Sequence, residues 1–211
     1  MLIDWTRLLP ALLCLLPPIA WFHGRRVRYR ALSHDWSGYW TRTFGLGLHS
    51  IDFGRAVLGA WCLTAGVAAL PDATGPWRHV ALIVQGAVLA TAVGLQTFVS
   101  KQPGTTHAPF AFVAGLVVGF LPLPIAGLAL CLAVAIAAGL RTPAGFFPAC
   151  AFAIMVLGLA LSGMAGLIRL ALIASITLLP WLLTLLFPRT LVLSHLTRRI
   201  SAAEAAEPDP R

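Results

Sequence analysis

Basic residues occupy alternate gaps between the hydrophobic stretches of this chain. One set of gaps contains Arg25, Arg26, Arg28, Arg30, Arg42, Lys101, Arg141, Arg189, Arg198 and Arg199. The other set contains Arg7, Arg78 and Arg169. Arginine and lysine collect in the cytoplasmic loops of membrane proteins. The pattern therefore predicts a multi-pass protein of a bacterial-type inner membrane. A composition of 59% hydrophobic and 10% charged residues excludes a water-soluble globule.

Hydropathy predicts an all-α, polytopic bundle of about seven transmembrane helices. A bilayer core of about 30 Å needs roughly 20 apolar residues per helix. The predicted spans are residues 8–22, 51–70, 79–99, 109–121, 125–140, 147–161 and 167–187. Seven spans put the N-terminus outside, make residues 1–190 one transmembrane domain, and leave residues 191–211 as a cytoplasmic tail with a disordered end. The fourth span is short, so five or six helices with a re-entrant pair stay open.

Lipid is the main partner that the composition predicts. The net charge of +8 comes from the basic loops and indicates attraction to anionic headgroups, not nucleic-acid binding. Small residues recur at helical spacing, as in Gly115 and Gly119. Such faces serve packing within a bundle or, less commonly, homo-oligomerisation. The four cysteines lie inside predicted spans: Cys14, Cys62, Cys131 and Cys150. Their spacing suits no metal, and we expect neither a metal nor a cofactor.

Polar side chains are scarce in the middle of the predicted spans, and the strongest candidates are Gln85 and Gln96. They are eleven residues apart, about three helical turns, so they share one face. The commoner interpretation is hydrogen bonding between neighbouring helices. The alternative is that both line a path for a small solute. Secondary active transport is disfavoured, because the middles of the spans are nearly empty of charge.

Cations and imidazoles gather at the predicted cytoplasmic surface. His49, Asp52 and Arg55 recur every three residues, broadly on one helix face. A phosphate-bearing substrate needs cations to neutralise it and an imidazole to move a proton. The candidate phosphate-binding residues are Arg42, Arg55, Lys101 and Arg198. The candidate proton-transfer residues are His107 and His195, with Asp52 and His49 in support. The simpler interpretation is that the basic residues only set the topology and that Asp52 and Arg55 form an ion pair at a helix entrance.

Four segments of the chain resemble a known family. Thr41-Arg42-Thr43-Phe44-Gly45, followed by Asp52-Phe53-Gly54-Arg55, is similar to the R-x-x-G…D-x-x-K-G segment of the bacterial acyl-phosphate:glycerol-3-phosphate acyltransferases. Residues 98–106 stand where that family has F-K-G-G-K-G-V-A-T, and residues 195–200 stand where it has H-R-x-N-I-x-R-L. The chain departs from the family at residues 33–41, where most of the phosphate-binding glycines are missing, and at Ala56, where the family has glycine.

The resemblance implies seven helices, an outside N-terminus and an active site formed by cytoplasmic loops. It implies acyl transfer to a phosphate-bearing acceptor, similar to glycerol 3-phosphate, at the cytoplasmic leaflet during phospholipid synthesis. Two other functions stay open. The lost glycines and the small-residue faces suit a non-catalytic scaffold or accessory subunit, and Gln85 with Gln96 suits a small-solute channel or transporter.

Overall fold

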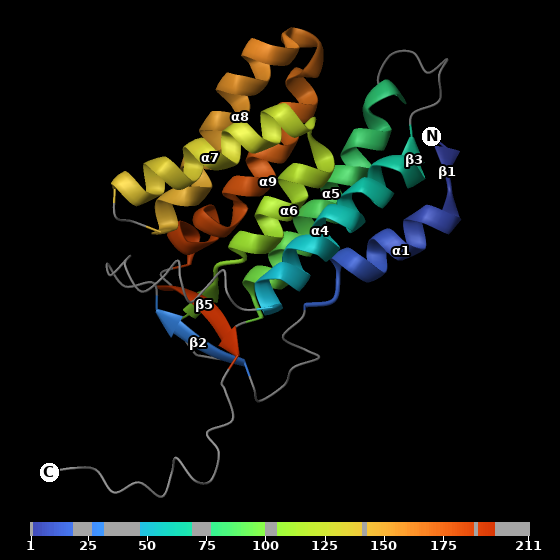
Figure 1. The fold of residues 1–211 in the computed structure, drawn as a ribbon. Helices are drawn as coiled ribbons and strands as arrows, with labels where there is room; N and C mark the ends of the chain where they lie inside the picture. Colours follow the sequence, from blue (N-terminus) through green and yellow to red (C-terminus); the bar gives the residue numbers. More distant parts are fainter. Residues whose placement is uncertain are drawn as a thin grey trace, which may run out of the picture.

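The computed structural model describes residues 2–18, 27–31, 47–68, 77–99, 105–140, 143–187 and 190–196. These residues form seven α-helices, drawn in Figure 1: α1 (Trp5–Leu15), α4 (Gly47–Gly66), α5 (Trp77–Thr97), α6 (Phe110–Phe120), α7 (Leu123–Gly139), α8 (Phe146–Ser162) and α9 (Leu167–Leu186). They also form five short strands: β1 (Leu2–Ile3), β2 (Val27–Ala31), β3 (Val67–Ala68), β4 (Thr105–His107) and β5 (Thr190–Leu196). The predicted helical class is confirmed. Arg42, Lys101, Arg141, Arg198 and the end of the tail lie outside the described residues.

The first helix differs from its predicted range of residues 8–22. It begins at Trp5, where the Asp4 side chain accepts a hydrogen bond of 3.0 Å from the backbone N–H of Thr6, and it ends at Leu15. Pro17 and Pro18 follow, and neither has an amide hydrogen for the next helical turn. α1 therefore ends inside the apolar stretch, because two consecutive prolines stop it, and residues 19–22 of the predicted span lie outside the described residues.

The later helix boundaries follow local breakers. α6 ends at Phe120 and α7 begins at Leu123, with Pro122 in the turn between them. α8 ends at Ser162, and Gly163 has a φ of 62°, a conformation that L-residues with a side chain rarely adopt. A short 3-10 turn, Met164–Gly166, then leads into α9, which continues through Pro180.

Close helix packing depends on glycine. α4 packs against both α1 and α6. A Cβ added to Gly119 of α6 would lie 2.5 Å from the Val57 carbonyl oxygen and 2.9 Å from the Ala60 Cβ, both in α4. One added to Gly115 would lie 2.8 Å from the Ala56 Cβ. The G-x-x-x-G pair therefore serves packing within the bundle, the commoner of the two uses predicted for it.

Small side chains fill the buried face of α7, whereas large apolar side chains are exposed on α7 and α8. The buried positions of α7 are Ile125, Ala126, Ala129, Ala133 and Ala137. Leu128 of α7 and Phe152 of α8 are instead exposed, by 52% and 65%. Soluble proteins rarely expose large contiguous apolar patches, whereas membrane helices approach each other through small residues.

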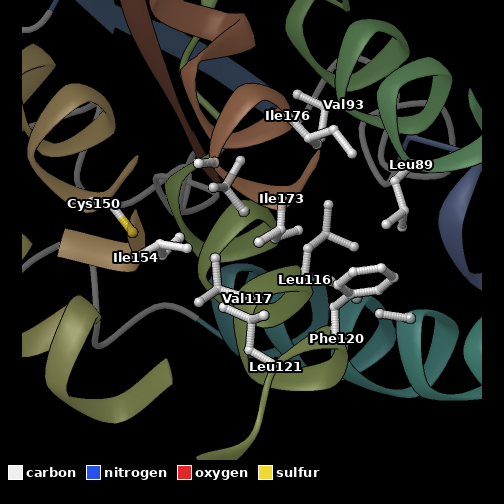
Figure 2. Close-up of a cluster of buried hydrophobic side chains, with 14 of the residues drawn as sticks. Leu89, Val93, Leu116, Val117, Phe120, Leu121, Cys150, Ile154, Ile173 and Ile176 are labelled. Atoms are coloured by element: carbon white, nitrogen blue, oxygen red, sulfur yellow. The ribbon is translucent and has the colours of Figure 1, made fainter. Parts of the chain in front are cut away.

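Larger apolar side chains fill the centre between α5, α6, α8 and α9, as Figure 2 shows. The labelled residues there are Leu89, Val93, Leu116, Val117, Phe120, Leu121, Cys150, Ile154, Ile173 and Ile176. All ten are nonpolar or, in the case of Cys150, a buried thiol.

Two helices in the described part of the chain, over His79–Thr97 and Met164–Leu186, are long and apolar enough to cross a membrane. The other apolar helices are shorter. α1 and α6 have eleven residues each, a rise of about 16 Å, which is about half of a bilayer core.

Two small sheets lie at opposite ends of the bundle (Figure 1). At one end β1 pairs with β3. At the other end β5 pairs antiparallel with β2 and parallel with β4, so the strand order is β2-β5-β4. Sequence analysis predicted none of these strands. The second sheet joins the segment after α1, the segment after α5 and the segment after α9, which are three of the gaps predicted to be cytoplasmic.

Candidate functional site

Buried polar side chains gather at the end of the bundle that carries the β2-β5-β4 sheet. His49 and Asp52 of α4, Gln96 of α5 and His107 of β4 are exposed by 6%, 4%, 3% and 6%. Arg55 lies one turn beyond Asp52 on α4. Burying polar groups is costly unless they bind one another or a ligand. These five residues are called the polar cluster below.

Arg55 holds α1 against α4. Its Nε donates to the Asp52 Oδ1 at 2.7 Å, and the two side chains are exposed by only 14% and 6%. Its Nη1 donates to the backbone oxygens of Cys14, at 2.8 Å, and Pro17, at 2.7 Å. The guanidinium carbon lies 4.8 Å from the centroid of the Phe112 ring of α6. One side chain therefore contacts three helices.

The end of α1 explains why an arginine is needed there. In a continuing helix the Cys14 carbonyl would accept the amide hydrogen of the residue four positions later, but that residue is Pro18. The Arg55 guanidinium supplies the missing donor and places a positive charge at the negative end of the helix dipole. The ion pair that the sequence suggested between Asp52 and Arg55 is thus confirmed, and it has an additional role in fixing α1.

His107 is held in one tautomer. Its Nδ1 lies 3.0 Å from the backbone oxygen of Gln96. A carbonyl oxygen can only accept, so the proton is on Nδ1 and Nε2 is the acceptor nitrogen. Burial and, to a smaller extent, the nearby His49 lower the pKa of His107 to about 4, although the hydrogen bond to Gln96 raises it. The ring is therefore neutral and able to accept a proton at neutral pH.

The structure brings together four of the eight predicted site residues, His49, Asp52, Arg55 and His107. His195 lies on β5, which pairs with β4, and its register partner is Arg28 of β2. The three remaining residues, Arg42, Lys101 and Arg198, lie outside the described ranges.

Two members of the environment were not predicted as site residues. Gln96 was considered only for packing or transport, yet its backbone orients His107. The Cys14 carbonyl also escaped prediction, although Pro18 four residues later signals an unpaired acceptor.

Gln85 has a different environment from Gln96. Its Nε2 donates to the Val67 carbonyl oxygen of β3 at 2.6 Å, near the opposite end of the bundle. The packing interpretation is confirmed for this residue. The apolar cluster of Figure 2 also fills the space between α5 and its neighbours. Neither observation supports a solute path that is lined by both glutamines.

No protein-family model, no curated protein and no solved structure matches the chain.

Proposed function

We propose that this chain is a multi-pass inner-membrane protein with seven membrane-embedded helices, an outside N-terminus and a cytoplasmic C-terminus. Three of the segments with basic residues meet in the β2-β5-β4 sheet at one end of the bundle. The alternating charge pattern predicts that all basic gaps lie on the same side of the membrane, so this meeting supports the proposal. The outward-facing leucine and phenylalanine side chains provide a lipid-facing surface.

The short helix α6 is compatible with this arrangement. Its eleven residues rise about 16 Å, which is about half of a bilayer core, so this helix would enter the membrane without crossing it alone. The residues before it stay at the cytoplasmic surface in this proposal. Thr106, His107 and Ala108 are buried, by 99%, 94% and 100%, and β4 is paired with β5.

The polar cluster is the proposed site of acyl transfer to a phosphate-bearing acceptor, similar to glycerol 3-phosphate, in phospholipid synthesis. The observation that carries this proposal is the buried, neutral His107 held by the Gln96 carbonyl near His49, which lies on α4 with Asp52 and Arg55. The acceptor hydroxyl oxygen would form a bond to the acyl carbon of an acyl phosphate, while His107 Nε2 takes the hydroxyl proton. The bond from the acyl carbon to the phosphate oxygen then breaks, and phosphate leaves with the electron pair.

The cations have unequal roles in this proposal. Arg55 already uses three N–H groups on Asp52, Cys14 and Pro17, so only its Nη2 can reach a substrate oxygen. The main neutralisation of phosphate is therefore assigned to Lys101, Arg42 and Arg198, and His195 is a second candidate for proton transfer.

The test is an assay in nanodiscs with acyl phosphate and radiolabelled glycerol 3-phosphate, followed by detection of a lipid product. We expect product from the natural sequence and a loss of about 10²–10⁴-fold for His107→Gln, since a positioned general base contributes that much. His79→Gln is the matched control, because His79 lies near the start of α5, far along the helix from Gln96. Lys101→Ala should also lose activity. No product from folded natural protein would contradict the proposal.

We infer one second candidate, a scaffold or accessory subunit. Arg55 pairs with Asp52 and holds the end of α1, and both contacts lie within this chain. A purely structural role accounts for them without a substrate. Affinity purification in mild detergent distinguishes the two. A stoichiometric partner protein without lipid product supports the scaffold, whereas a product-forming chain without partner contradicts it.

A further inference from the structure

We propose that Gln96 completes an oxyanion-binding site with Arg55, in which the Gln96 carboxamide and the Arg55 guanidinium donate to one phosphate monoester group. This inference rests on the proposed function and names the side chain that would set its preference for phosphate. Gln96 was not among the predicted site residues.

Both side chains have buried N–H groups that are not used within the described part of the chain. Gln96 is 3% exposed, and its Nε2 has no hydrogen-bond partner there. The same holds for the Arg55 Nη2. Leaving a buried donor unsatisfied costs much of the desolvation energy of that group, so such atoms call for an acceptor. Each of these two nitrogens carries two N–H groups, and a phosphate has several acceptor oxygens.

The helix geometry places Gln96 at the level of Arg55. Gln85 reaches Val67 just beyond the end of α4. Gln96 is three turns further along α5 on the same face, a distance of about 16 Å. The same distance back along α4 from Val67 reaches Ala56, the neighbour of Arg55. α4 and α5 contact each other, and the start of α4 and the end of α5 lie at the same end of the bundle (Figure 1).

This arrangement suits the reaction because one residue acts on both the base and the substrate. The Gln96 backbone oxygen fixes the tautomer of His107, and its side chain holds the phosphate. The acceptor hydroxyl of a phosphate monoester bound there lies within the polar cluster that contains His107 Nε2. Gln96 is therefore a positioning residue for the base and a direct contact for the substrate.

The experiment is a titration of purified protein in phosphatidylcholine nanodiscs with inorganic phosphate and with glycerol 3-phosphate, followed by isothermal calorimetry. A second series places phosphatidic acid in the nanodiscs and measures its binding by fluorescence, which separates a lipid headgroup from a soluble phosphate. We expect Gln96→Leu to weaken binding of at least one probe by about 10- to 100-fold, the effect of losing a hydrogen bond to a charged group.

Gln85→Leu is the matched control on the same helix face. Its carboxamide is occupied by Val67, so its phosphate affinity should stay within about twofold of the natural sequence, as for distant and independent sites. Gln96→Glu is the second variant, and it guards against misfolding of Gln96→Leu. Its carboxylate would accept from Arg55 Nη2 and repel phosphate, so the variant should fold and bind no phosphate.

The outcomes separate this inference from the proposed function. Equal binding by Gln96→Leu and the natural sequence, or no binding of any probe by the natural sequence, overturns the inference. Weaker binding by Gln96→Leu together with no lipid product upholds the site and contradicts only the acyl transfer. Lipid product together with unchanged binding by Gln96→Leu upholds the acyl transfer and contradicts the role of Gln96 in binding phosphate.

Discussion

Replacing Arg55 by leucine removes one ion pair and two hydrogen bonds at the junction of α1 and α4. The Asp52 carboxylate, 6% exposed, loses the guanidinium 2.7 Å away, and the Cys14 and Pro17 oxygens lose their donor. Breaking a buried ion pair by removing one partner costs roughly 3–5 kcal/mol. Since the hydrogen bonds belong to the same side chain, their energies do not add independently. We expect Arg55→Leu to lower the free energy of unfolding by about 3–5 kcal/mol in total.

Asp52→Asn is the matched comparison, because its amide oxygen can still accept from the Arg55 Nε and both α1 carbonyls stay bonded to Arg55. It should lower the free energy of unfolding by about 1–2 kcal/mol, less than Arg55→Leu. The assay is unfolding of the purified protein in mixed micelles by increasing denaturing detergent, followed by helical circular dichroism. A cost below about 1 kcal/mol for Arg55→Leu, the range of solvent-exposed pairs, would refute the clamp. A larger cost for Asp52→Asn than for Arg55→Leu would refute the role of the α1 carbonyls.

Three further predictions use the same unfolding assay. Gly119→Ala should destabilise the protein by about 1–3 kcal/mol, because the added Cβ meets the Val57 carbonyl. Gly94→Ala is the control: nothing lies within 4 Å of its added Cβ, so it should be neutral or stabilising by up to about 1 kcal/mol. Equal effects of the two would contradict the packing of α6 on α4. The folded state keeps His107 neutral to about pH 4, so the unfolded state binds the extra proton first as the pH falls from 6.5 towards 4. Stability should therefore be full above pH 6.5 and fall by up to about 1.4 kcal/mol per pH unit below it, and a slope that His107→Gln leaves unchanged would contradict this. Arg169→Leu should cost about 1–3 kcal/mol, since Arg169 donates to the Phe120 carbonyl and lies over its ring, and a neutral result would show that the contact contributes nothing.

A common feature links Arg55 and Arg169. Each comes from one helix and donates to a carbonyl at the end of another, α1 or α6. Each also lies over a phenylalanine ring, with the guanidinium carbon 4.8 Å from the centroid. Helix ends leave carbonyls unpaired, and prolines follow both ends. Arginine is suited to such places because its planar fork donates in several directions and also stacks on aromatic rings.

The helices were largely readable from sequence because hydropathy and chain breakers act locally. Pro122 and Gly163 mark turns in the sequence and in the structure. The early end of α1 was equally readable from Pro17 and Pro18, but the apolar stretch was followed past them. His49, Asp52 and Arg55 were grouped correctly because a spacing of three residues keeps side chains on one face of a helix.

Other features depend on contacts between distant segments. β2, β4 and β5 form only because three gaps meet at one end of the bundle, and none of these short segments has a partner within its own stretch of sequence. The neutrality of His107 results from burial, and its tautomer is set by the Gln96 carbonyl; no local pattern encodes either. By itself, then, the sequence determined the helices, the chemistry of the basic gaps and the small-residue faces, since these are properties of single segments. Only the tertiary structure decided that Arg55 secures α1 and that Gln96 joins the polar cluster, because burial and hydrogen-bond partners exist only once the helices have packed.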